Sequence, residues 1–172
     1  LEACIVAIAR PSCCNCIMMK AATSTRARPA QFGWDELLDN VRQHHGLQLS
    51  AERAYRLVSQ GMPARLVDPI SQTLGMAKAD LAILMGLDRS TATRLSAADK
   101  TVPMHSAESV LRLLELHELA TDVFGTLEQA KAWLQRPHPL FDEAAPVEAA
   151  RSSYGAQRVK DMLVSIKYGG VV

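Results

Sequence analysis

Apolar residues recur at helical spacing in the last part of the chain. Positions i, i+3, i+4 and i+7 share one face of an α-helix, and they are occupied by Val159, Met162, Leu163 and Ile166. Gly169 follows, where a residue with positive φ commonly ends a helix. The pattern predicts an amphipathic helix and, after it, a short segment with an ammonium group, an aromatic ring and a carboxylate.

Two interpretations of this ending stay open. In the first, the helix packs on its own domain and leaves a frayed tail. In the second, the segment from Lys167 to Val172 inserts into a pocket of another protein.

Two more amphipathic helices are predicted before it. One begins at Ser106, ends at Gly125 and carries an apolar face with Val110, Leu113, Leu114, His117, Thr121 and Phe124. The next begins with the capping box Thr126–Gln129 and buries Leu127, Ala130, Trp133 and Leu134. We interpret His117 as a core histidine rather than a ligand, whereas Trp133 suits either the core or a partner interface.

A helix-turn-helix is predicted in the middle of the chain. Lys78 to Met85 and Ser90 to Ala97 form two short helices around the turn Gly86–Asp88. Two steeply crossing helices need a small contact residue, here Ala82, and a turn residue that tolerates positive φ, here Gly86. The second helix would offer to a major groove Arg89, Ser90, Thr91, Thr93 and Arg94. Any compact three-helix unit can show this pattern, so a mere packing module is the alternative.

The N-terminal third divides into a lead and a helical hairpin. Residues 1–30 are predicted to be a disordered or mis-assigned lead, and residues 31–60 a hairpin for dimerisation or domain packing, whose first helix ends at Gly46. All four cysteines lie in the lead, at positions 4, 13, 14 and 16. They lack a second separated pair, so a zinc ribbon is not indicated. A metal or redox sensor is a minor alternative.

Composition narrows the class of protein. The chain has 172 residues, a formal net charge of +1 and only 5% aromatic residues. It is rich in Ala and Leu and lacks hairpin turn signals, which predicts an all-α helical bundle. No stretch is long and apolar enough to span a membrane, and we expect a cytoplasmic protein. Because no phosphate loop, nucleophile elbow or metal-ligand helix occurs, we predict no enzyme activity, metal or cofactor.

Charge also bears on DNA binding. Residues 61–125 carry six basic groups, Arg65, Lys78, Arg89, Arg94, Lys100 and Arg112, against eight acidic ones. A slightly acidic helix-turn-helix region does not favour tight DNA binding by a monomer. We therefore expect binding to need an oligomer or a complex.

The C-terminal motifs resemble a known family as an ordered set. They are Trp133–Pro139, Pro146-Val147, Tyr154-Gly155-Ala156, Val159, Leu163 and Ile166–Gly169. This set resembles the toxin-binding domain of the Xre/MbcA/ParS antitoxins, and with Val123–Gly125 and the helix-turn-helix the resemblance covers roughly Gly61 to Val172. The chain departs from the family at Leu140–Glu143, where a Leu-Gly-Gly-type turn is frequent. It also departs at Lys167, where an acidic residue is frequent, and at Gly169-Gly170, where one glycine is usual.

The resemblance implies the antitoxin of a type II toxin–antitoxin module. Such a protein neutralises a RES-type toxin that consumes NAD⁺ and represses its own operon. It implies a helix-turn-helix region at 61–125 that binds operator DNA, a toxin-binding domain at 126–172, and a homodimer within a larger toxin–antitoxin complex. We expect toxin contacts from Trp133, Arg158, Lys167, Tyr168, Gly169, Gly170, Val171 and Val172. A stand-alone helix-turn-helix regulator with a C-terminal dimerisation domain is the alternative.

Overall fold

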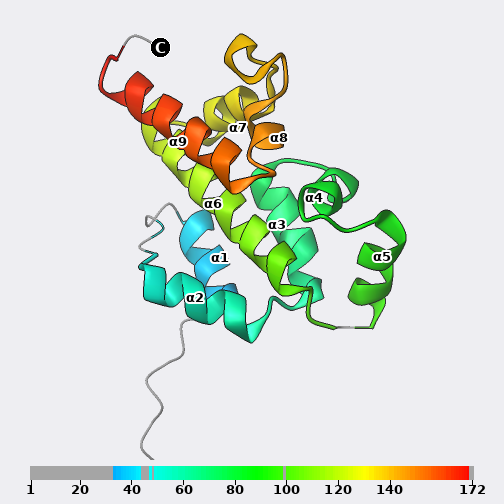
Figure 1. Ribbon diagram of the computed structural model, residues 1–172. Helices are drawn as coiled ribbons and strands as arrows, with labels where there is room; N and C mark the ends of the chain where they lie inside the picture. The colour runs from blue at the N-terminus through cyan, green and yellow to red at the C-terminus, as the bar shows by residue number, and fades with distance from the viewer. Residues whose placement is uncertain (1–32, 44–46, 48, 99, 171–172) are drawn as a thin grey trace, which may run out of the picture. The chain divides into compact units, whose positions relative to one another are not determined.

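The computed structural model describes residues 33–43, 47, 49–98 and 100–170. Throughout these residues the fold is helical, as predicted, and an isolated bridge between Pro63 and Thr101 is the one β-type pairing in them. Figure 1 shows the helices, which are α1 (Trp34–Arg42), α2 (Ala51–Gln60), η1 (Ala64–Leu66), α3 (Val67–Leu74), α4 (Lys78–Leu84), α5 (Arg89–Ala97), α6 (Met104–Phe124), α7 (Leu127–Gln135), η2 (Pro139–Phe141), α8 (Pro146–Ala149) and α9 (Ser153–Lys167).

Helix α6 forms the centre of the core. Its 21 residues span about 30 Å at the usual rise, and it packs against α2, α7 and α9 (Figure 1). Its fully buried side chains include Val110 and Leu114, and His117 is also buried, with 2% of its surface exposed. The interpretation of His117 as a core residue is therefore confirmed.

The predicted start of α6 at Ser106 is wrong. The helix begins at Met104, directly after Pro103. Proline suits the start of a helix because the first amides of a helix have no partner within it, and proline has no amide hydrogen. The buried Ser106 hydroxyl instead donates a hydrogen bond to the carbonyl of Met85, at 2.8 Å. Ser106 thereby attaches the end of α4 to the first turn of α6.

Helices α1 and α2 lie within residues 31–60, the segment for which the sequence predicts a hairpin. The indole nitrogen of Trp34 donates a buried hydrogen bond to the carbonyl of Leu57, at 3.0 Å. Ser50 caps α2 as predicted, because its hydroxyl accepts from the amide of Arg53. Helix α1 ends at Arg42, four residues before the predicted Gly46. The capping residue is Gln43, whose amide bonds to the carbonyls of Asp39 and Val41.

The described residues belong to one compact unit. The predicted lead of residues 1–30 lies outside the described residues, with its four cysteines. The same holds for His44, His45, Val171 and Val172.

Candidate functional site

Helix α9 lies along α6 and runs parallel to it. Lys160 of α9 pairs with Glu115 of α6 at 2.7 Å, and Lys167 pairs with Asp122 at 2.6 Å. Both partners advance by seven residues between the two ion pairs, so the helices run in the same direction and in register. These pairs, together with the apolar face between them, attach α9 to the central helix.

The predicted buried face of α9 is correct in three of its four positions. Val159, Met162 and Leu163 are buried, whereas Ile166 is 38% exposed. The periodicity identifies the buried side of α9, but the burial does not extend into the last turn of the helix.

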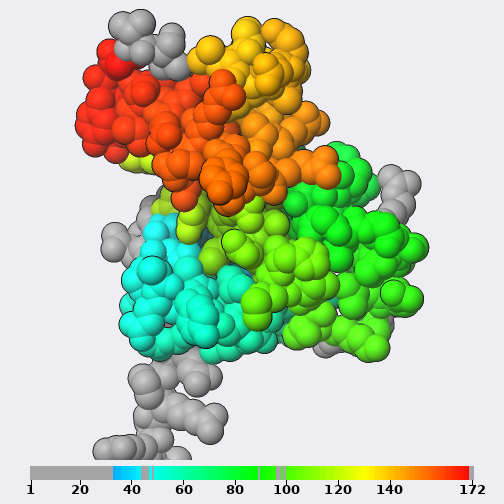
Figure 2. All heavy atoms as spheres, in the orientation of Figure 1, coloured from blue at the N-terminus to red at the C-terminus, as the bar shows by residue number. Residues whose placement is uncertain are grey.

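The opposite face of α9 carries exposed apolar side chains. Tyr154 is 87% exposed, Val164 is 44% exposed and Tyr168, just past the helix, is 77% exposed. Tyr154 and Val164 are not among the predicted site residues, although at 100° per residue each lies about 140° around the helix from the buried Val159. Figure 2 shows α9, coloured orange to red, on the surface of the molecule beside the segment that leads to α8. We call Tyr154, Val164 and Tyr168 the α9 surface.

A row of aromatic rings joins two of the predicted contact residues. The ring of Trp133 lies 5.5 Å from that of Phe124, tilted by 40°, and 6.4 Å from His138, which in turn lies 5.9 Å from Phe141. The guanidinium of Arg158 lies 5.7 Å from the Phe141 ring centre, within cation–π range. Trp133 is half-buried and belongs mainly to the core edge, and Arg158 lies exposed at the other end of the row.

The end of α9 is closed rather than extended. Gly169 has φ +70° as predicted, and the amides of Gly169 and Gly170 bond to the carbonyls of Ile166 and Ser165. This pair of bonds is the Schellman motif. Lys167 to Gly170 therefore belong to the helix end, with the Tyr168 ring exposed on it and 5.8 Å from the Lys167 ammonium.

The start of α9 requires a glycine for steric reasons. Ser152 caps the helix by accepting from the amide of Gly155, at 3.0 Å. A Cβ at Gly155 would lie 1.9 Å from the carbonyl oxygen of Ala149 in α8. Arg112 of α6 donates to the carbonyl of Arg151 at 3.2 Å, so the turn between α8 and α9 is fixed to the central helix.

The helix-turn-helix prediction agrees with the structure. Gly86 has φ +71° and stands between α4 and α5. Ala82 is 2% exposed at the helix contact, and Leu87 after the turn is buried. The amide of Leu87 bonds to the carbonyl of Ala82 at 2.9 Å, which closes α4.

The candidate DNA-binding residues lie on α5, but two of them already have partners. The hydroxyls of Ser90 and Thr91 donate to the carboxylate of Asp88, at 2.5 and 2.6 Å. Thr93 and Arg94 are exposed. The side chain of Arg89 lies outside the described part of the chain.

Asp88, predicted only as part of the turn, has a further role. Its carboxylate also accepts from the Thr91 amide at 2.9 Å, so it caps α5. These hydrogen bonds from Ser90 and Thr91 hold the pKa of the Asp88 carboxyl well below its usual range. The spacing Asp-x-x-Thr is a recognisable capping signal.

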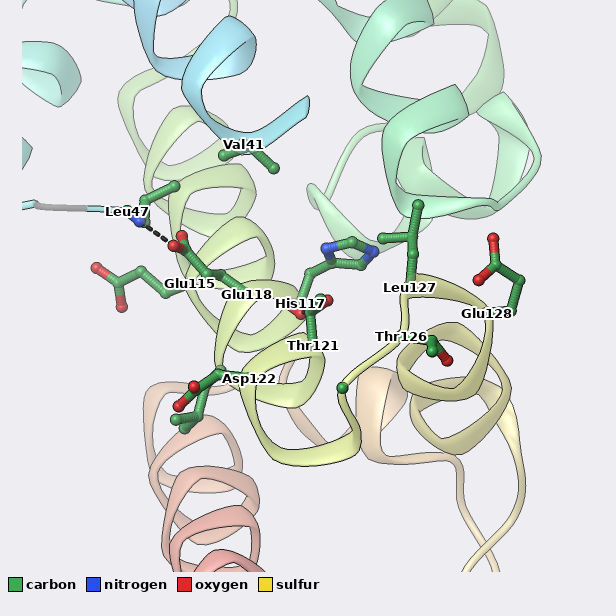
Figure 3. A pocket seen from close by; sticks show the side chains of 12 residues that line it. Val41, Leu47, Glu115, His117, Glu118, Thr121, Asp122, Thr126, Leu127 and Glu128 are labelled. Carbon is green, nitrogen blue, oxygen red and sulfur yellow. Dashed lines mark hydrogen bonds between the residues drawn. The ribbon is translucent and has the colours of Figure 1, made fainter. Parts of the chain in front are cut away.

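A cleft of about 800 Å³ lies beside α6 (Figure 3). Acidic side chains from α6 and α7 line it, with His117 and Leu47 among the other residues. Glu115 and Asp122 are paired with lysines of α9, and Glu118 accepts a hydrogen bond from the amide of Leu47. Within the described residues no cluster of three or more His, Cys, Asp or Glu side chains could hold a metal ion.

None of the helices among the described residues is long and apolar enough to cross a lipid bilayer.

Comparison with known families matches two adjoining parts of the chain. The antitoxin Xre-like helix-turn-helix domain matches residues 52–115, and the antitoxin Xre/MbcA/ParS C-terminal toxin-binding domain matches residues 119–169. The two matches meet inside α6. The second contains the α9 surface and the row of rings, and the first contains α4 and α5.

Two similar proteins are both named Antitoxin Xre. One, from Pseudomonas putida KT2440, is 27% identical over 71 residues, which are 41% of this chain and 45% of that protein. The other, from Photorhabdus laumondii subsp. laumondii TT01, is 25% identical over 115 residues, which are 66% of this chain and 77% of that protein. The chain thus spans less than half of the first relative. With a match to the helix-turn-helix domain of these antitoxins and, after it, a match to their toxin-binding domain, the chain belongs to the Xre/MbcA/ParS-type antitoxins.

Proposed function

We propose that this chain is the antitoxin of a type II toxin–antitoxin module, which binds its cognate toxin through the C-terminal domain and represses its own operon through the helix-turn-helix. Its role is binding rather than catalysis, in keeping with its family. The observation that carries the proposal is the α9 surface, because it lies within the residues that match the toxin-binding domain. Resemblance to antitoxins that commonly pair with RES-domain toxins supports a RES-type, NAD⁺-consuming toxin as the partner.

The α9 surface has the character of an interface centre. Two tyrosines and one valine are exposed along it, and aromatic anchors are the residues that most often dominate binding energy. Arg158 lies exposed on the same helix, and arginine is also enriched in interfaces. A single tyrosine on the surface would need no explanation, but three such side chains along one helix favour a partner.

The helix end is the second part of the proposed toxin contact. The Schellman motif stops α9 at Gly169 and holds Tyr168 outward. We propose that the segment from Lys167 to Val172 lies at or in the active-site cleft of the toxin. Together the helix face and the helix end would bind the toxin and block it.

Operator binding is proposed for α5. The family match to a helix-turn-helix and the exposed Thr93 and Arg94 support it. The excess of acidic over basic groups in residues 61–125 favours binding by a homodimer or by the toxin-bound complex. Two linked copies would reach two half-sites about one helical turn apart, and linkage raises the effective concentration of the second copy.

Co-expression with the protein encoded by the adjacent gene tests the proposal. We expect the two proteins to copurify, and the full chain to restore growth and cellular NAD⁺ in cells that make the toxin. Deletion of Tyr168 to Val172 should remove protection while circular dichroism shows an unchanged helix content. Copurification without any effect on NAD⁺ would exclude a RES-type toxin. A chain that self-associates through α9 and binds no neighbour would favour the stand-alone regulator.

A further inference from the structure

The N-terminal end of α5 is occupied by the protein's own carboxylate. In a helix-turn-helix, the first turn of the second helix meets base edges in the major groove, and free amides at a helix start favour phosphate. Here Asp88 already accepts from the Thr91 amide. A phosphate or a base acceptor that approached this end would meet a negative charge instead of a free donor.

The two hydroxyls beside Asp88 are oriented by the same carboxylate. Each hydroxyl has one hydrogen to donate, and those of Ser90 and Thr91 are both donated to Asp88. What remains on both oxygens is acceptor capacity only. Asp88, Ser90 and Thr91 thus present three acceptor groups, the carboxylate and two hydroxyl oxygens, and the two hydroxyls supply no donor to DNA.

Base edges in the major groove differ in what they offer to such a surface. Guanine presents two acceptors, whereas cytosine presents an amino donor and adenine an amino donor beside an acceptor. The acceptors of Asp88, Ser90 and Thr91 fit the amino groups and repel the acceptors of guanine and of phosphate. A carboxylate that accepts from the cytosine amino group is a known pairing of this kind.

We propose that Asp88 is a specificity-determining residue of this helix-turn-helix, which excludes guanine and phosphate from the start of α5 and admits a cytosine or adenine amino group there. This inference rests on the proposed binding of operator DNA. It also limits the hydroxyls of Ser90 and Thr91 to accepting hydrogen bonds from DNA. Asp88 would then increase the discrimination between DNA sequences and lower the affinity for DNA of random sequence.

Selection from randomised duplexes, with the full chain in its toxin complex, tests the inference. Asp88→Asn keeps a good capping residue but removes the charge and adds a donor. We expect the variant to admit guanine at one base pair and to lose about fivefold or more of the discrimination there, the usual weight of one base contact. Its affinity for random-sequence DNA should rise. The control Asp39→Asn makes the same change of charge on α1 and should alter neither property.

The outcomes separate the two proposals. If the unaltered complex binds no DNA, operator binding itself is wrong and the role of Asp88 falls with it. If the unaltered complex selects an operator and Asp88→Asn selects the same one with the same affinity, only the role of Asp88 is overturned. Circular dichroism and thermal unfolding of the variant verify that α5 is still capped.

Discussion

The ammonium of Lys167 lies 2.6 Å from the carboxylate of Asp122 and joins the last turn of α9 to the last turns of α6. Lys167 was predicted as a toxin contact, yet within the chain it has a structural partner. Both side chains are more than one third exposed, 38% and 56%, so water screens the pair and its contribution to stability is small. The pair positions the end of α9, where Tyr168 is exposed.

The first prediction concerns the pH dependence of this pair. The hydrogen bond and charge of Asp122 raise the pKa of Lys167 above its ordinary value of 10.5. A raised lysine pKa means that the contribution is fully present below pH 10.5 and is lost as the pH rises through the higher value. The melting temperature of Asp122→Asn should lie slightly below that of the unaltered protein at pH 8 and equal it above the raised pKa. An identical gap at both pH values would refute the role of the pair, and Asp39→Asn serves as the control.

The second prediction concerns Gly155. An alanine Cβ there would meet the Ala149 carbonyl oxygen at 1.9 Å, so the backbone of α8 or α9 must move. We expect Gly155→Ala to lower the free energy of unfolding by about 1–3 kcal/mol, the usual cost of overpacking. Gly125→Ala is the contrast, because nothing lies near its Cβ and only its φ of +77° is strained, at about 1 kcal/mol. Urea denaturation of both variants measures the difference, and an equal or smaller loss at Gly155 would contradict the close approach.

The third prediction concerns the loop after η2. Asp142 and Glu143 have φ of +57° and +63°, a conformation that costs a non-glycine residue about 1–2 kcal/mol. This explains why a glycine-containing turn is frequent at this place in the antitoxins that the chain resembles. Glu143→Gly should stabilise the protein by up to about 1 kcal/mol, after the entropy lost by glycine is subtracted. Glu128→Gly, inside α7, should instead destabilise it by about 1 kcal/mol. A loss of stability in Glu143→Gly would show that the loop conformation is not strained.

The fourth prediction concerns Arg94 on α5. If it contacts a phosphate, Arg94→Ala should weaken binding evenly across DNA sequences and reduce the salt slope by about one. If it reads guanine, the loss should be about 1–3 kcal/mol at one base pair. Binding measured at several salt concentrations distinguishes the two contacts, with Arg56→Ala on α2 as the control. Operator affinity unchanged in the Arg89→Ala, Arg94→Ala double variant would remove α5 from the DNA interface, and toxin binding should survive in either case.

Local rules explain which features could be predicted from the sequence. The buried face of α9, the turn at Gly86 and the end at Gly169 depend on spacing and on positive φ, which neighbouring residues determine. The hydrogen bond of Ser106, by contrast, depends on a carbonyl 21 residues away. The row from Trp133 to Arg158 likewise joins two helices. Such features follow from tertiary packing between distant parts of the chain, and the spacing of apolar residues along the sequence does not reveal them.

The affinity of the toxin for the α9 surface tests the central claim most directly. The double variant Tyr154→Asp, Val164→Asp places charge on this surface and changes no buried side chain. Tyr55→Asp is the control, because Tyr55 is also an exposed tyrosine but lies on α2. Titration calorimetry with the purified cognate toxin should show at least about 30-fold weaker binding for the α9 variant, as expected when interface anchors are lost. The Tyr55 variant should bind as the unaltered chain does. Equal affinities for the two variants would contradict the assignment of α9 to toxin binding.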